Sequence, residues 1–145
     1  MSKKIIMAIA NFKYSDITQK IIGCAFNVHN KLGSGFQEVI YQRALAAEMD
    51  KAGLKYSREE EIPIYYDDQN IGTRRVDFVV EQNVILELKA VAELEKVHLA
   101  QSLNYLEAFK FETGLLINFG AKSLEFKRLI SKKHEVLANP VNPSR

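Results

Sequence analysis

Two apolar segments that lie close together in the sequence carry charged residues able to do chemistry. Asp77 lies in the first segment, and Glu87 and Lys89 lie in the second. Only three residues, 81–83, separate the segments, and this spacing predicts a hairpin loop. We therefore expect an antiparallel pair of strands in which Val80 faces Val84 and Asp77 faces Glu87.

This register divides the hairpin side chains between two faces, because side chains alternate along a strand. We expect a charged face made of Arg75, Asp77, Glu87 and Lys89. The opposite face, turned to the core, would carry Val76, Phe78, Leu86 and Leu88. A two-residue loop would instead place Asp77 opposite Leu88 and scatter the charged group.

Two carboxylates that face each other need a neutralising partner. Directly opposed side chains have Cβ atoms about 4.5–5.5 Å apart, where like charges destabilise a sheet. Mg²⁺ or Mn²⁺ between Asp77 and Glu87 would remove the repulsion, because hard cations prefer oxygen ligands. With Lys89 beside them, these are the parts needed for phosphodiester hydrolysis. A half-solvated face with ordinary salt bridges to Arg75 and Lys89 is the alternative.

The elements that position these residues follow from hydrophobic spacing. A helical pattern begins after the expected N-cap at Ser15-Asp16 and ends at Gly33, and a second helix covers 36–52. A third helix is expected over 94–109, and strands over 61–66, 74–80, 84–89, 115–119 and 124–130. The order α-α-β-β-β-α-β-β predicts an α/β domain over 15–130, with a central mixed sheet flanked by helices. Residues 1–14 form an N-terminal segment and 131–145 a tail.

The composition excludes several classes of protein. The chain has 145 residues, a length typical of one domain, and 47% of them are hydrophobic. Its longest apolar run has six residues, whereas a membrane span needs about 20. One cysteine, Cys24, cannot form an internal disulfide, so we expect a cytoplasmic protein without membrane association. The net charge of +2 is no signature of nucleic-acid binding, and the histidines show no zinc-site spacing.

A family resemblance rests on two motifs. Asp77 followed by Glu87-Leu88-Lys89 resembles the D…ExK signature of the PD-(D/E)XK nuclease superfamily. Residues 35–41 read G-x-x-E-x-x-Y, which resembles the bacterial GxxExxY proteins, a branch of that superfamily. Further matches include Val28-His29, Gln101, Asn104-Tyr105-Leu106 and 115–120, so the resemblance spans roughly 15–130. Two positions depart from the family pattern. Val76 stands where the superfamily name expects proline, and Ser34 stands between the two glycines, where the family often has proline.

The resemblance implies a restriction-endonuclease-like fold and Mg²⁺-dependent cleavage of nucleic acid. Carried over by residue, Asp77, Glu87 and the backbone carbonyl of Leu88 would be metal ligands. Lys89 would be the catalytic lysine, and Glu38 an extra acid that reaches the metal from a helix. The helix dipole alone would also explain a glutamate at position 38, because a carboxylate is favoured near the start of a helix.

Substrate-contacting residues are expected on two helices and one strand. Gln101 and Tyr105 would lie on the helix after the ExK strand and face the scissile phosphate. Tyr41 shares the helix face of Glu38. Arg74 and Arg75 are good phosphate donors or structural partners of an acid. Tyr105, Arg75 and Tyr41 are thus the candidates for binding substrate, with Gln101 as a positioning residue.

We expect a metal-dependent nuclease that acts on DNA in repair, recombination or defence. The alternative is a non-catalytic member that binds nucleic acid or protein, and the intact Asp77, Glu87 and Lys89 favour the nuclease. A ribonuclease stays open, because nothing in the sequence reports on a 2′-hydroxyl. No sequence-reading motif is visible, which leaves open a homodimer or a protein partner as the source of specificity.

Overall fold

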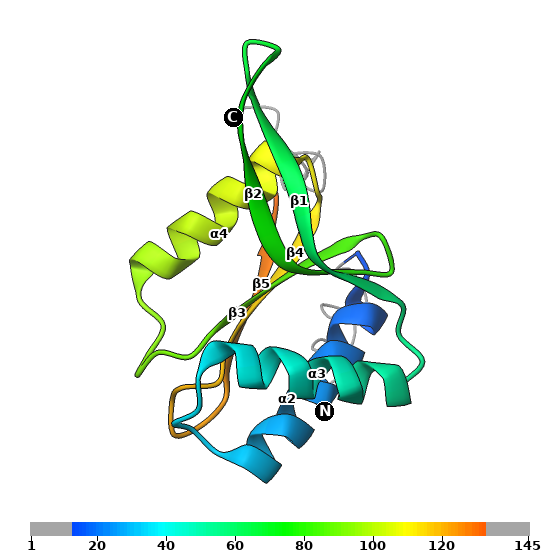
Figure 1. Cartoon of the computed structure of the whole chain (residues 1–145), viewed down its shortest axis with the longest axis vertical. Coiled ribbons are helices and arrows are strands. Elements are labelled where there is room, and N and C mark those ends of the chain that lie inside the picture. The colour runs from blue at the N-terminus through cyan, green and yellow to red at the C-terminus, as the bar shows by residue number, and fades with distance from the viewer. Residues whose placement is uncertain (1–12, 133–145) are drawn as a thin grey trace, which may run out of the picture.

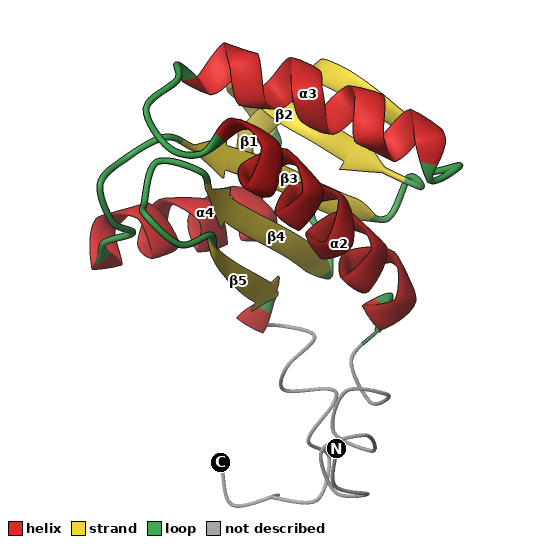
Figure 2. Cartoon of the chain, turned by 90° about the horizontal axis from the view of Figure 1, so that it is seen from below, coloured by secondary structure: helices red, strands yellow, loops and turns green. Residues whose placement is uncertain are grey.

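The computed structural model describes residues 13–132 and has the element order that the sequence predicts. Figure 1 shows the eight elements and Figure 2 their layers. The helices are α2 (Ser15–Leu32), α3 (Glu38–Lys51) and α4 (Lys96–Phe109). The strands are β1 (Tyr56–Tyr66), β2 (Gln69–Val80), β3 (Val84–Lys89), β4 (Thr113–Asn118) and β5 (Glu125–Ile130). The predicted N-terminal segment and C-terminal tail lie almost entirely outside the described residues.

The five strands form one mixed sheet in the order β1-β2-β3-β4-β5. β3 and β4 run parallel, and the other neighbouring pairs are antiparallel. Every residue of β4 is buried, as are all but the last residue of β3. Strands covered on both faces read as continuous apolar runs, which is why both were visible in the sequence.

Helices cover both faces of the sheet, so two apolar clusters form the core (Figure 2). α2 and α3 pack on one face, where Tyr41, Phe78 and Phe119 are completely buried. α4 packs on the other face, where Leu106 meets Ile85 and Leu116. The expectation of a mixed sheet flanked by helices is confirmed.

The β1–β2 hairpin is longer than the sequence predicts, and it projects beyond α4 (Figure 1). β1 starts at Tyr56 rather than 61, and β2 starts at Gln69 rather than 74. Residues 57–61 of β1 are exposed, and β1 lies at the edge of the sheet. An exposed edge strand needs no apolar alternation, so hydrophobic periodicity could not detect it.

The helix ends differ from the predictions by one to two residues. α2 ends at Leu32, and the C-cap residue that follows it, Gly33, has φ 68°, as the prediction of a C-cap glycine requires. At the other end Tyr14 holds the N-cap position and Ser15 is already helical, so the expected Ser15-Asp16 cap is wrong. None of the described helices combines the length and the apolar character needed to cross a membrane.

Candidate active site

The candidate site lies where β2 and β3 separate. The expected register holds for Val80–Val84 and Phe78–Leu86, after which no further backbone pairs join the two strands. Beyond that point the Asp77 carboxylate replaces a backbone partner, and its Oδ2 accepts a 2.7 Å hydrogen bond from the Leu88 amide. The pairing between strands therefore opens at the predicted carboxylates.

The distortion continues into β1. Glu59 lies between the residues that pair with Phe78 and Val76, and it has φ 52°, in the left-handed region. β2 follows β1 from there on and leaves β3. For this reason the predicted face of Val76 is wrong: Val76 packs in the α4-side cluster, whereas Phe78 packs under α2 and α3.

Glu87 is a buried carboxyl group with few partners. Its residue is 5% exposed, and its Oε1 atom is buried without a hydrogen-bond partner among the described residues. Its nearest cation is Arg74, whose Nη2 lies 4.0 Å from Oε2. Burial first, and then the charge of Asp77 and a hydrogen bond with it, raise the pKa of Glu87 to about 8. The two carboxyl groups therefore influence each other's ionisation.

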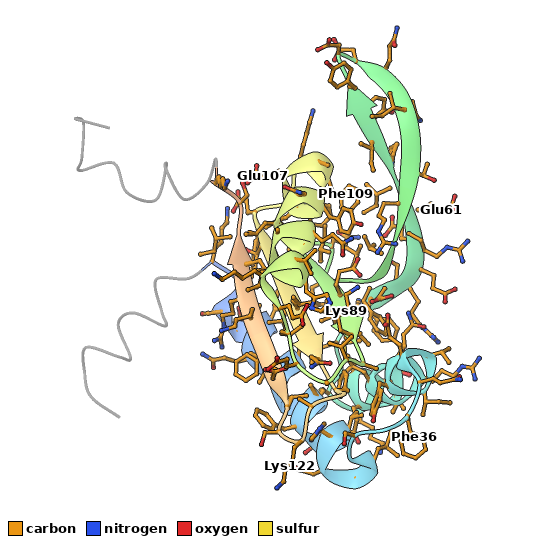
Figure 3. The ribbon with its side chains drawn as sticks, turned by 90° about the vertical axis from the view of Figure 1, so that its left-hand side faces the viewer. Phe36, Glu61, Lys89, Glu107, Phe109 and Lys122 are labelled. Atoms are coloured by element: carbon orange, nitrogen blue, oxygen red, sulfur yellow. The ribbon has the colours of Figure 1, made fainter. Side chains whose placement is uncertain are left out.

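Lys89 and Glu38 complete the charged surroundings of this pair. Lys89 is the half-buried last residue of β3 (Figure 3), and its positive charge partly offsets the rise in the pKa of both Glu87 and Glu38. Glu38 is the first residue of α3. Partial desolvation, followed by the charge of Asp77, raises the pKa of Glu38. Glu38 therefore feels the charge of Asp77 from the start of α3, but its residue is exposed and, among residues 13–132, it is not grouped with the two carboxylates closely enough to share an ion.

Two residues that sequence reasoning missed hold Asp77 in place. Gln42 is 6% exposed, and its Nε2 donates to Asp77 Oδ1 over 3.4 Å. Arg58 Nη2 donates in turn to Gln42 Oε1 over 2.9 Å. Gln42 was detectable, because it follows Glu38 by four residues on one helix face. Arg58 gave no signal, since it lies in the exposed strand that periodicity did not predict.

Of the two residues predicted on α4 to face the phosphate, Tyr105 contacts a residue beside the carboxylates. The Tyr105 ring lies under the Arg74 guanidinium at 4.7 Å from its centroid. Gln101 is exposed one turn earlier, and its positioning role stays a prediction. His98 is engaged at the start of the helix, where its Nδ1 accepts from the Glu95 amide.

The substrate-binding roles expected for Tyr41 and Arg75 do not fit their surroundings. Tyr41 is completely buried, its hydroxyl donates to Gly33 O over 2.5 Å, and its ring stacks on Phe119. It closes the turn before α3. Arg75 contacts Glu61 on β1 over 3.4 Å instead of Lys89. Figure 3 shows Glu61 on the outer side of the hairpin, away from Lys89. Its side chain turns away from the carboxylates because the hairpin twists at Asp77.

The candidate ligand atoms are carboxylate and carbonyl oxygens, which hard cations prefer. Within residues 13–132, no three His, Cys, Asp or Glu side chains are grouped to hold a metal ion, so the carboxylate pair would need further oxygen ligands. Mg²⁺ usually binds one or two carboxylates and keeps water or substrate oxygens. The Leu88 carbonyl is a suitable neighbour, because N–H and C=O of a strand residue point to the same side and the Leu88 amide meets Asp77. The unpartnered Glu87 Oε1 is the atom that a cation would satisfy.

Comparisons with known proteins show the family and the fold of the chain. A family model described as the PD-(D/E)XK nuclease superfamily matches residues 15–129. The crystal structure of SSO0001 superposes with a TM-score of 0.51 at 17% sequence identity, over 65% of this chain. The chain spans only 50% of that structure, so the likeness concerns the fold. No curated protein matches the sequence.

Proposed function

Because the chain belongs to the PD-(D/E)XK nuclease superfamily, we propose that it hydrolyses phosphodiester bonds in DNA with a divalent metal ion, Mg²⁺ or Mn²⁺. Its mixed sheet with helices on both faces is a restriction-endonuclease-like fold. The observation that carries the proposal is the half-buried Asp77 next to the buried Glu87, whose Oε1 has no hydrogen-bond partner among the described residues, with Lys89 beside them. The GxxExxY branch, a biological role in repair, recombination or defence, and a second copy or protein partner that supplies specificity stay predictions.

Each residue has a distinct part in the proposed reaction. Asp77, Glu87 and the Leu88 carbonyl would hold the ion. The ligand role predicted for Glu38 lacks support, because within residues 13–132 Glu38 is not grouped with the two carboxylates closely enough to share an ion. A bound divalent ion supplies charge stabilisation on the phosphate and lowers the pKa of a coordinated water. Lys89 would orient the attacking water and offset negative charge that develops on the phosphate. Gln101 would help position the phosphate from α4.

Asp77 is prepared for this role by its neighbours. The Leu88 amide and Gln42 both donate to its carboxylate, so its rotamer is set before any ligand arrives. The Arg58–Gln42 contact fixes the orientation of the Gln42 amide in turn. Such support of a metal-ligating carboxylate typically maintains affinity and activity.

Cleavage assays test the proposal directly. The purified chain should nick or cut DNA with Mg²⁺ or Mn²⁺ and stop with a chelator. Lys89→Ala should lower the rate about 100-fold or more and keep metal binding, because it removes a charge-stabilising group and no ligand. Asp77→Ala and Glu87→Ala should lose both. Lys127→Ala, on the exposed part of β5, is the matched control.

The substrate panel should hold duplex, flapped, branched and single-stranded DNA, together with RNA. Cleavage of RNA alone would make the protein a ribonuclease. Absence of metal-dependent cleavage on the whole panel, or a Lys89→Ala variant as fast as wild type, would contradict the nuclease proposal. A non-catalytic binding module would then be the better interpretation.

A further inference from the structure

Arg74 is held beside the carboxylate pair but its hydrogen-bonding capacity is poorly used. Its guanidinium lies over the Tyr105 ring at 4.7 Å, and its Nη1 donates to the Arg75 carbonyl over 3.0 Å. Its Nε is buried and has no hydrogen-bond partner among the described residues. The Nη2 contact with Glu87 is 4.0 Å long, beyond hydrogen-bond distance.

This arrangement leaves one nitrogen of the guanidinium and one oxygen of the neighbouring carboxyl group without a hydrogen-bond partner among the described residues. If Arg74 served only to neutralise Glu87, a paired contact at hydrogen-bond distance would be expected. Instead both Arg74 Nε and Glu87 Oε1 lack a partner. The Arg74 side chain keeps 35% of its surface exposed, so an anion can reach it from solvent.

The adjacent arginine provides an internal comparison. Arg75 pairs with Glu61 on the outer side of the hairpin, and both side chains are 59% exposed. Consecutive residues of a strand point to opposite faces, so Arg74 alone faces the carboxylates and α4. Among the described residues, Arg74 and Lys89 are the cations whose charge acts on both Glu38 and Glu87.

We propose that Arg74 binds a phosphate of the nucleic-acid substrate beside the Asp77–Glu87 pair, and that Tyr105 is a positioning residue that holds the guanidinium plane. The inference rests on the proposed function and names the group that recognises its substrate. A guanidinium offers two parallel N–H donors to a phosphate, and stacking on an aromatic ring limits its rotation. The positive charge of Arg74 also offsets the repulsion that a phosphate meets when it approaches two carboxylates.

Binding and cleavage measured separately test this inference. Fluorescence anisotropy with a short labelled DNA duplex in chelator reports binding without turnover, at a series of salt concentrations. Arg74→Ala should weaken binding about tenfold and lower the salt slope by about one, as expected for one lost phosphate contact. Arg74→Lys should keep the slope because it keeps the charge. Arg75→Ala removes the same charge from the other face and should leave the slope unchanged.

The positioning role of Tyr105 is tested by a measurement that a loss of folding alone would not reproduce. Tyr105→Phe retains the ring and should bind as wild type, whereas Tyr105→Leu should weaken binding. The Tyr105→Leu effect should vanish in the Arg74→Ala background, because the tyrosine acts through the arginine. Melting temperatures of all variants exclude loss of fold as the cause.

The outcomes separate this inference from the proposed function. If wild type binds DNA through Arg74 but never cleaves it with metal, the nuclease proposal fails and the phosphate site stands. Equal losses for Arg74→Ala and Arg75→Ala would overturn the phosphate site. So would an unchanged salt slope in Arg74→Ala, because Arg74 would then be only the ion-pair partner of Glu87.

Discussion

At the level of single residues, the buried carboxyl group of Glu87 stands out by its strongly raised pKa. Its pKa rises from its usual 4.5 to about 8, first by burial and then by the charge of Asp77. The folded protein therefore binds more protons than the unfolded chain between these values. Stability linked to this group is fully present below pH 4.5 and is lost as pH rises through about 8.

The metal-free protein should accordingly become less stable as pH rises from 4.5 to about 8. Glu87→Gln carries no titrating group at this position and should show a clearly smaller decrease. Urea unfolding in chelator across this pH window measures the difference. Glu93→Gln, at an exposed loop position, should keep the wild-type dependence. Parallel pH curves for wild type and Glu87→Gln would contradict the raised pKa.

Among the elements, the ends of β3 and β4 hold Lys89 in position. Asn118 pairs with Lys89 in the parallel register, and its side chain bonds both the amide and the carbonyl of Val91 at 2.9 Å. Gly120 follows, and a Cβ there would lie 2.4 Å from the Val91 carbonyl oxygen. The backbone after β3 is therefore packed directly against the backbone after β4.

Gly120→Ala should destabilise the fold by about 2 kcal/mol or more, because backbone rather than a flexible side chain must move. It should also lower cleavage by displacing the end of β3 that carries Lys89. Urea unfolding and the cleavage assay measure the two effects. Gly23→Ala is the matched control: it lies in α2 with nothing within 4 Å, and should stabilise the helix by up to about 1 kcal/mol. Equal stability of the two variants would contradict the packing argument.

In the whole molecule, ligand binding and folding are linked through the carboxylate pair. A cation that binds only the folded state at tenfold its Kd adds about 1.4 kcal/mol. For a domain of this size that raises the melting temperature by roughly 4 °C. The increase should be larger near pH 8 than at pH 4.5, because the ligands must lose their protons.

Asp77→Asn should reduce this response to Mg²⁺ or Mn²⁺ while leaving the metal-free protein at least as stable as wild type. The comparison belongs above about pH 8, where Glu87 is ionised: the amide oxygen still accepts from Leu88, and the repulsion between the two carboxylates disappears. Thermal melts with and without Mn²⁺ test this. Asp68→Asn, at the exposed hairpin turn, is the control and should respond as wild type. An identical melting curve for wild type at saturating Mn²⁺ would count against the metal site.

The sequence by itself determined the element order, the Val80–Val84 register and the proximity of Asp77 to Glu87. These features depend on local spacing: a three-residue loop, helical periodicity and apolar strands buried on both faces. The placement of two neighbouring acids close to Lys89 followed from the same short segment, whereas the burial of Glu87 did not. The predicted order of strands and helices is for this reason close to the observed one.

Only the tertiary structure decided which neighbours complete the site. The hairpin twist at Asp77 turns Arg74 toward Glu87 and Arg75 toward Glu61, and local alternation could not locate that twist. Support from Gln42 and Arg58 comes from α3 and β1, across long sequence separations. Tyr41 is buried because α3 packs against the sheet, where its hydroxyl closes the turn at Gly33. Such contacts depend on how twisted strands and helices pack together, which residue spacing along one segment does not encode.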